Sequence, residues 1–210
     1  MLSGCHYREE SPAAAGEGKV TLERIAVVPF QQLVPDDSSG SVLDSPPYGS
    51  AISTSAVRGN PEQRLEALFL KKLDESKPTF SLIAGERVAG TFRRVSANSL
   101  KTPLRQILRD TGAELGADGI VVGHLHRFRE REGTAYTVEH PASVAFEIHL
   151  LRVSDGALVW RGVFNRTQTS LMEDLFQIFS FYRGRGRWVT AEELMEEGIE
   201  QALKSFPGLP

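Results

Sequence analysis

The chain has 210 residues, of which 40% are hydrophobic, so it can bury the core of one compact domain beside shorter flexible segments. Its formal net charge of -3 at pH 7 excludes a general nucleic-acid binder. The single cysteine excludes an intrachain disulfide and a cysteine-rich zinc site, and no apolar run is long enough to span a bilayer.

A lipoprotein-type motif stands at the start of the chain. In Leu2-Ser3-Gly4-Cys5, an aliphatic residue and two small residues precede a cysteine. This resembles bacterial lipoproteins, in which a signal peptidase cleaves before a cysteine whose thiol carries diacylglycerol. We interpret residues 1–5 as the remnant of such a signal, with a lipid anchor on Cys5. The charged and apolar regions of a secretory signal are missing, so we expect a shortened leader or a misassigned start. Because His6 follows the cysteine, instead of the aspartate associated with inner-membrane retention in enteric bacteria, we expect anchoring in the outer membrane.

Residues 6–20 are polar, contain an alanine run and two glycines, and predict a flexible tether before a single α/β domain at 21–210. Within that domain, 25–30 is a short apolar run that predicts a strand buried on both faces. The loop 31–60 that follows is unusually long and contains no clear element. Such loops are usually either functional or disordered, and we expect this one to be disordered in isolation.

Two helices and a strand are predicted next. Asn60-Pro61 has the pattern of an N-cap followed by a proline in the first turn, and apolar residues at helical spacing follow it. A strand is expected at 80–84. Thr102-Pro103 opens a second helix, which ends at Gly116. No element is predicted around Asn98.

The second half of the chain predicts antiparallel strands and a final helix. Its expected strands are 120–128, 142–153 and 157–167, with a hairpin turn at Asp155-Gly156. Thr190 and Glu193 have the spacing of a capping box at the start of the last helix. The element order is thus β-α-β-α-β-β-β-α. It predicts an α/β fold with a mixed sheet of about five strands and helices packed on it.

Three segments in this order suggest a family. They are the apolar run at 25–30, the stretch Gly116-Ala-Asp-Gly-Ile-Val-Val-Gly, and the strand pair around Leu158-Val-Trp. Together with the lipoprotein motif they resemble the periplasmic fold of the TolB N-terminal domain. Similar domains occur in the lipoproteins CsgG, a curli secretion pore, and LpoB, an activator of peptidoglycan synthases. The resemblance covers most of the chain. It implies a non-enzymatic protein that acts through protein contacts at the cell envelope.

The chain departs from this family pattern in two places. Loop 31–60 is longer than expected, and an insert at 168–189 precedes the last helix. Neither segment has the long apolar alternation of a membrane-crossing β-hairpin. Formation of a pore is therefore not implied by the resemblance.

Two histidines on a predicted strand are a candidate metal site. His124 and His126 lie two residues apart and therefore on one face of the strand. Such a pair can form part of a zinc site with His140 or His149 as a third ligand. Solvent-facing histidines are the simpler interpretation, so no metal and no cofactor are predicted.

Charged residues gather after the same strand. A carboxylate pair for acid-base catalysis is one interpretation of this pattern, but a solvated strand end of mixed charge is favoured. The sequence has no nucleophile elbow, P-loop or metalloprotease motif, so no catalytic residue is predicted. The charged residues are Glu130, Glu132 and Glu139, which alternate with Arg127, Arg129 and Arg131.

The insert at 168–189 combines aromatic residues with a short basic run. The plainer interpretation is a helix packed on the sheet with a basic loop after it. The other is an exposed patch that contacts a partner or anionic head groups, because aromatic residues and arginine are enriched at interfaces. The residues of this candidate contact surface are Phe179, Phe181, Tyr182, Arg183, Arg185, Arg187 and Trp188.

These features predict a lipid-anchored periplasmic accessory protein of the cell envelope that is not an enzyme. Its attachment to the membrane is expected through the lipid on Cys5. The expected partner is an envelope protein or a second copy of the chain, and no nucleic acid is expected. The alternative is a periplasmic hydrolase acting on cell-wall or lipid material. An accessible cleft holding two or more convergent titratable groups would favour the hydrolase.

Overall fold

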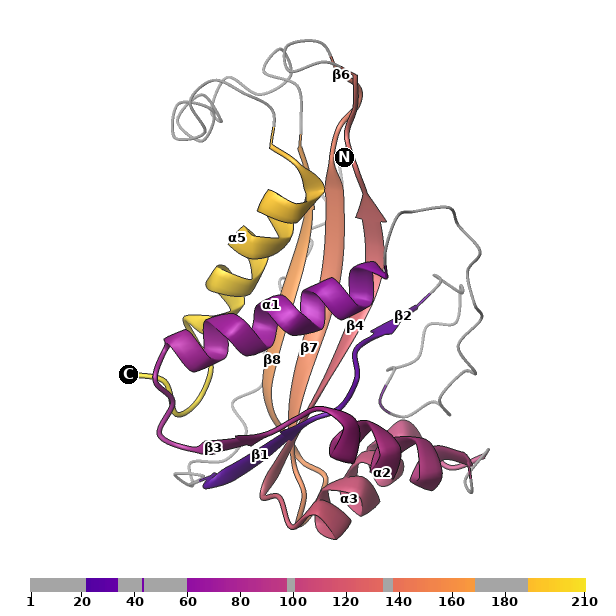
Figure 1. Ribbon diagram of the computed structural model, residues 1–210, viewed down its shortest axis with the longest axis vertical. Helices are drawn as coiled ribbons and strands as arrows, with labels where there is room; N and C mark the ends of the chain where they lie inside the picture. The colour runs from indigo at the N-terminus through magenta and orange to yellow at the C-terminus, as the bar shows by residue number, and fades with distance from the viewer. Residues whose placement is uncertain (1–21, 34–42, 44–59, 98–100, 134–137, 169–188) are drawn as a thin grey trace, which may run out of the picture.

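The computed structural model describes residues 22–33, 43, 60–97, 101–133, 138–168 and 189–210. As far as β4 the strands are interspersed with helices, and long antiparallel strands follow before a final helix (Figure 1). The elements are β1 (Arg24–Val27), β2 (Gln31–Gln32), α1 (Pro61–Glu75), β3 (Ser81–Ile83), α2 (Glu86–Ala97), α3 (Leu104–Leu115), β4 (Gly119–Arg129), β5 (Glu132–Gly133), β6 (Val138–His140), β7 (Ser143–Arg152), β8 (Leu158–Thr167) and α5 (Ala191–Leu203).

A mixed sheet forms the centre of the fold. Its strand order is β3-β1-β4-β7-β8, and β2 also pairs with β4. β1 is parallel to both β3 and β4, whereas β4, β7 and β8 form an antiparallel meander. The predicted mixed sheet is therefore confirmed. Its parallel part arises because helices connect the early strands, and its antiparallel part because the Asp155-Gly156 turn joins β7 directly to β8.

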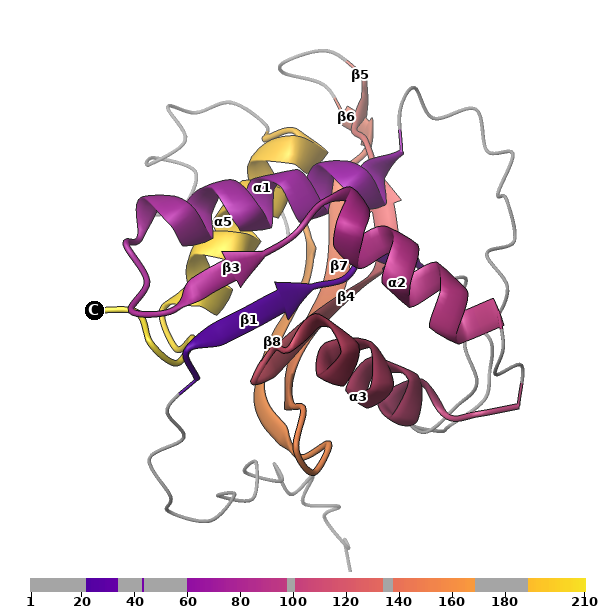
Figure 2. The same cartoon turned by 60° about the horizontal axis from the view of Figure 1, so that its bottom comes forward.

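Helices cover both faces of this sheet. α1 and α5 lie over one face, across β4, β7 and β8, and α2 and α3 lie over the other face beside β1 (Figures 1 and 2). Phe69 and Phe146 are buried in the first core, and Leu108 and Ile120 in the second. Each such side chain stabilises the fold by roughly 1.5–3 kcal/mol on leaving water. None of the helices within the described ranges is long and apolar enough to cross a membrane.

Local sequence signals set the ends of several elements. Gly116 ends α3 in the left-handed conformation, with a φ of 65° that glycine adopts without strain. The predicted capping box opens α5: the Glu193 N–H donates to Thr190 Oγ1 at 3.1 Å, and the Thr190 N–H donates to Glu193 Oε2 at 2.9 Å. Asn60 occupies the N-cap of α1 as predicted, but its side chain makes no capping hydrogen bond.

The start of β1 is tied to the turn that precedes β4. The Asp118 carboxylate accepts hydrogen bonds from the backbone N–H groups of Glu23, at 3.2 Å, and Arg24, at 2.9 Å. The Asp118 N–H in turn donates to the Arg24 carbonyl at 2.8 Å. These bonds join segments far apart in the chain and hold β1 between β3 and β4.

Three details differ from the sequence prediction. α2 is not among the predicted elements, because only Val88 and Phe92 are buried along it and its apolar stripe is narrow. Loop 31–60 begins with the short strand β2, which pairs with β4. Leu158 packs against the core under α2 and α3 instead of sharing a face with Trp160, because a bulge in the β7–β8 pairing lies between them.

Candidate functional site

The centre of the sheet brings two histidines and a glutamate together. His124 lies on β4, and Glu147 and His149 lie on β7. His124 is directly opposite Glu147 in the antiparallel pairing, and His149 is two residues further along β7 on the same face. Each residue offers a side-chain nitrogen or oxygen, and these three atoms all lie within 4.8 Å of one another.

These three side chains, which we call the His-Glu-His cluster, are almost completely removed from water. His124 is 0% exposed, His149 5% and Glu147 7%. Among the described residues, neither ring nitrogen of His124 has a hydrogen-bond partner, nor does Nδ1 of His149. Leaving a buried polar group without a partner costs about 1–3 kcal/mol, so this arrangement has unused binding capacity.

Glu147 is the charged centre of the cluster. Its Oε2 accepts a hydrogen bond from Arg161 of β8 at 2.8 Å, and its Oε1 lies 3.4 Å from Nε2 of His126. Nε2 of His149 lies 3.7 Å from Oε2. Burial raises the pKa of the Glu147 carboxyl, but the contacts with His126 and Arg161 outweigh burial and lower the pKa to about 2. The carboxylate is therefore ionised at neutral pH.

The two buried histidines are neutral at the same pH. Burial is the main cause that lowers the pKa of His124 to about 4, and the proximity of His149 adds to the effect. Burial also lowers the pKa of His149. A neutral imidazole keeps one nitrogen lone pair, so the cluster presents two nitrogen donors and one carboxylate. That donor set suits divalent transition metals such as zinc.

The structure changes the sequence interpretation of the histidines. The prediction of solvent-facing side chains is wrong for His124, because β4 lies inside the sheet and is buried on both faces there. His126 contacts Glu147, but its side chain is 33% exposed. His149, one of the two proposed third ligands, does join His124. His140 is exposed on β6 and lies outside the cluster.

Glu147 and Arg161 are site residues that sequence reasoning missed. The apolar stripe of β7 was the predicted signal there, and the opposite face of the same strand carries Glu147 and His149 by simple alternation. Alternation along β7 alone places Glu147 and His149 on the same face of that strand. It does not place them beside His124 or Arg161, because that requires the register between β7 and its two neighbours.

Residues of the charged strand end make hydrogen bonds with neighbouring elements. Arg127 donates to Ser143 Oγ and to Asn165 Oδ1, and the exposed Glu130 accepts a hydrogen bond from the backbone N–H of Ala191 at 3.1 Å. Glu132 lies on β5, and Glu139 is part of β6. The lipidation candidate Cys5 and the candidate contact residues at 179–188 lie outside the described residues.

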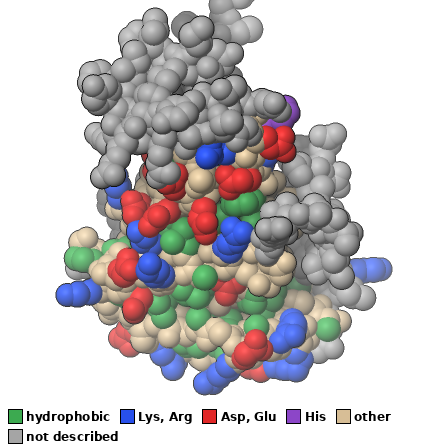
Figure 3. Space-filling view, turned by 45° about the horizontal axis from the view of Figure 1, so that its top comes forward, with side chains coloured by type: hydrophobic (Ala, Val, Ile, Leu, Met, Phe, Trp, Pro, Cys, Tyr) green, Lys and Arg blue, Asp and Glu red, His purple; other side chains and the backbone are tan. Residues whose placement is uncertain are grey.

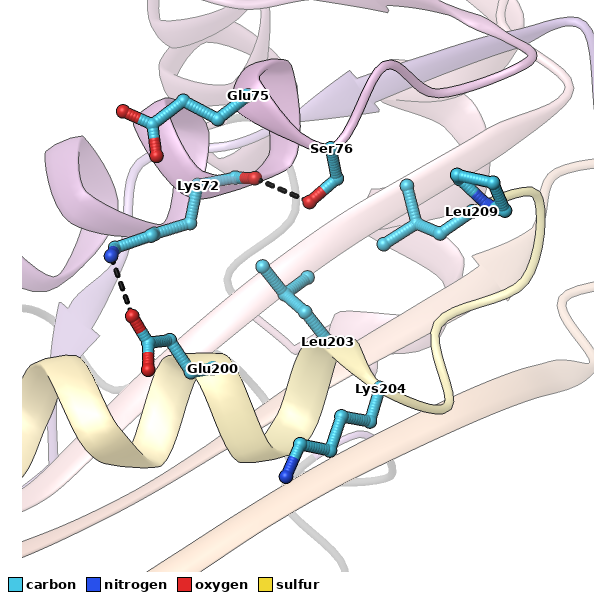
Figure 4. Close-up of a pocket in the computed structure, with 8 residues that line it drawn as sticks. Lys72, Glu75, Ser76, Glu200, Leu203, Lys204 and Leu209 are labelled. Carbon is cyan, nitrogen blue, oxygen red and sulfur yellow. Dashed lines mark hydrogen bonds and ion pairs between the residues drawn. The ribbon is translucent and has the colours of Figure 1, made fainter.

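A hollow of about 460 Å³ lies between the end of α1 and the end of α5 (Figure 4). On its wall, Lys72 Nζ contacts Glu196 at 2.7 Å and Glu200 at 2.6 Å, and Ser76 Oγ donates to the Lys72 carbonyl. Hydrogen bonds to these two carboxylates raise the pKa of Lys72 above its usual value. Lys72, Glu196 and Glu200 are thus paired with one another, and the hollow is a weaker site candidate than the cluster.

The surface seen in Figure 3 has mixed charge. Acidic and basic side chains are interspersed, and the hydrophobic side chains between them form small separate patches. The ion pairs between α1 and α5, such as Arg64 with Glu192 at 3.9 Å, fit this pattern. Exposed pairs of this kind stabilise a protein by about 1 kcal/mol or less each. The described residues visible on this face therefore form no single-sign patch for a strongly charged ligand.

Comparison with known proteins found likenesses in structure only. No protein-family model matches the chain. No curated protein matches it either. A PelC dodecamer from Paraburkholderia phytofirmans aligns with a TM-score of 0.49 and 13% identity, over 90% of this chain and 89% of that chain. Lipoprotein GNA1162 from Neisseria meningitidis aligns with a TM-score of 0.43 and 15% identity, over 78% and 96% respectively. The LpoB C-terminal domain from Salmonella enterica aligns with a TM-score of 0.37 and 15% identity, over 71% and 86%. LpoB is one of the proteins that the sequence resembles, and at these identities the similarity concerns the fold alone.

Proposed function

We propose that this chain is a lipid-anchored accessory protein on the periplasmic face of the outer membrane, and that it acts through protein contacts without catalysis. The observation that carries the contact role is the edge strand β8. It is 10 residues long, and no described residue pairs with its outer side. Near its centre stands Val163, which is 54% exposed and is the one exposed large hydrophobic side chain of the described residues.

An open edge strand is a template for another chain. Its unpaired N–H and C=O groups can hydrogen-bond an incoming strand, which is a common mode of protein recognition. The strand at the opposite edge, β3, has only three residues and therefore offers fewer backbone N–H and C=O groups to an incoming strand. The candidate contact surface of the insert follows β8 directly in the chain, since β8 ends at Thr167. We therefore propose that β8 and the insert bind the same partner, an envelope protein or a second copy.

A hydrolase is supported less well. The titratable groups that converge in the described residues are those of the His-Glu-His cluster, and these are buried. At the hollow between α1 and α5, the Lys72 ammonium is already paired with Glu196 and Glu200. Neither place combines open access with a free acid and base, which a hydrolytic site requires.

The anchor is tested by replacing Cys5 with alanine in the chain expressed behind a complete secretory signal. The unaltered protein is expected in the membrane fraction, because acyl chains contribute about 0.8 kcal/mol per buried methylene and two or more chains anchor stably. Cys5→Ala is expected to move the protein to the soluble fraction. Ser3→Ala, which keeps a small residue before the cysteine, serves as the control and should remain in the membrane. Mass spectrometry that finds the Cys5 thiol unmodified in the membrane-isolated protein would contradict the anchor.

The contact role is tested by measuring association of the lipidated protein. Chemical crosslinking in isolated outer membranes and sedimentation in detergent would detect either a second copy or another envelope protein. Val163→Lys should weaken the association about tenfold or more, because a lysine on an edge strand opposes strand addition. The double change Phe181→Ala and Trp188→Ala should weaken it as well, since aromatic anchors dominate binding energies.

Ala84→Lys is the matched control for this test. Ala84 is exposed in the segment after β3, at the other side of the sheet, so a lysine there adds the same charge away from β8. It should leave association and melting temperature unchanged. The proposal would be wrong if Val163→Lys and the double Phe181→Ala, Trp188→Ala variant both associated as the unaltered chain does. A large fall in melting temperature with association intact would instead place Phe181 and Trp188 in a core.

A further inference from the structure

We propose that His124, Glu147 and His149 bind one divalent transition-metal ion, a role that goes beyond the proposed contact function. The juxtaposition depends on the sheet register. Two strands that are separated in sequence place two imidazoles and one carboxylate on the same face, with their donor atoms within 4.8 Å. Random surface histidines do not meet a carboxylate in this way inside a sheet that is covered on both faces.

The distances allow coordination after small side-chain rotations. Zinc binds histidine nitrogen and carboxylate oxygen at about 2.0–2.2 Å, which places tetrahedral ligand atoms roughly 3.3–3.6 Å apart. His149 Nε2 is already 3.7 Å from the Glu147 carboxylate. The rings of His124 and His149 have centroids 6.1 Å apart and an interplanar angle of 59°. One donor atom of each of the three residues already lies within 4.8 Å of the others, so side-chain rotation has a short distance to cover.

Burial makes a bound ion favourable to the fold. His124 is 0% exposed and has no hydrogen-bond partner on either ring nitrogen among the described residues. A metal ion would take the lone pair of each neutral imidazole and a carboxylate oxygen. It would thus provide a partner for a ring nitrogen of the fully buried His124. Two imidazoles in a set of three donors favour zinc, copper, nickel or iron over magnesium and calcium, which prefer oxygen ligands.

The surrounding residues support the carboxylate from outside. Arg161 donates to Glu147 Oε2 at 2.8 Å, the same oxygen that lies 3.7 Å from His149 Nε2, and the Arg161 side chain is itself 55% exposed. Hydrogen bonds of this kind orient metal-binding carboxylates and tune their affinity. His126, whose side chain is 33% exposed, lies beside the other oxygen of Glu147.

The test uses the untagged full-length protein and zinc as the probe. After treatment with chelator and dialysis, the chain should take up one Zn²⁺ per chain, measured by elemental analysis and by competition with a chromogenic chelator. The melting temperature should rise with free zinc concentration, because an ion that binds only the folded state stabilises it by mass action. His124→Ala and His149→Ala should each abolish stoichiometric binding. Arg161→Ala should weaken binding about 10- to 100-fold, as loss of an outer partner does.

His140→Ala is the matched control, because His140 is an exposed histidine outside the cluster. It should bind zinc as the unaltered chain does. If the ligand variants do not fold, X-ray absorption of the zinc-loaded unaltered protein decides. Two imidazole nitrogens and one carboxylate oxygen around the ion support the site. A zinc shell without imidazole, no uptake of zinc, or equal uptake by a folded His124→Ala variant would overturn the proposal.

Discussion

Replacing Phe69 with alanine is expected to lower the free energy of unfolding by about 3–5 kcal/mol, as other phenylalanine-to-alanine changes in cores do. Phe69 is 0% exposed on α1. Its ring centroid lies 5.6 Å from that of Phe30, just before β2, and 6.1 Å from that of Phe206, after α5. The Phe69 side chain therefore packs α1 against the segment before β2 and against the segment after α5. A cavity at this place removes three sets of contacts at once.

The loss should be measured by urea unfolding of the purified domain, with the denaturant slope compared between variants. Gln63→Ala on the exposed side of the same helix is the control, and its effect should stay within about 0.5 kcal/mol. Single domains have total stabilities of about 5–15 kcal/mol. The Phe69 variant should consequently lose at least about a fifth of its total stability. A loss below about 1 kcal/mol would mean that this core rearranges to fill the space.

Replacing Gly198 with alanine should destabilise the protein although alanine is the better helix former. A Cβ at Gly198 would lie 2.6 Å from the Phe164 ring and 2.9 Å from the Phe146 ring. Overpacking of this kind costs about 1–3 kcal/mol, whereas the gain in helix propensity is about 0.5–1 kcal/mol. The cost of overpacking therefore exceeds the gain in helix propensity. Both rings belong to strands that α5 packs against, so neither can move away freely.

Gly90→Ala isolates the packing effect. Gly90 is in the interior of α2, and a Cβ there would meet no atom within 4 Å. The same chemical change should thus stabilise the protein by about 0.5–1 kcal/mol. Thermal or denaturant unfolding of both variants gives the difference, which equals the cost of the close approach between α5 and the sheet. If Gly198→Ala were as stabilising as Gly90→Ala, α5 would not be seated on Phe146 and Phe164 as described.

The sequence predicted most of this fold because its signals are local. The left-handed Gly116, the capping box at Thr190 and the turn at Asp155-Gly156 each act within a few residues, and each stands where it was expected. α2 escaped prediction because its two buried residues, Val88 and Phe92, form too narrow a stripe among polar neighbours. The face of Leu158 was wrong because a bulge is a property of strand pairing, which a single strand does not reveal.

The candidate site was harder to predict than the fold for the same reason. His124 and His126 were recognised as a pair on one strand, and His149 as one possible third ligand. Glu147 was not recognised, because its place opposite His124 follows from the register between β4 and β7. Alternation within a strand is readable from sequence, whereas register is set by the whole sheet. The contact residues at 179–188 remain a sequence prediction, since they lie outside the described residues.

The position of β1 has a mechanical consequence for a chain tethered at its N-terminus. If Cys5 is held in a membrane, any pull on the domain reaches β1 before any other strand. β1 lies inside the sheet, with parallel ladders to β3 and β4. The Asp118 carboxylate accepts hydrogen bonds from the backbone N–H groups of Glu23 and Arg24 at its start. A load along β1 must therefore shear two ladders together instead of peeling one bond at a time. A load that enters at the N-terminal end of the described fold is thus shared between β3, β4 and the Asp118 hydrogen bonds.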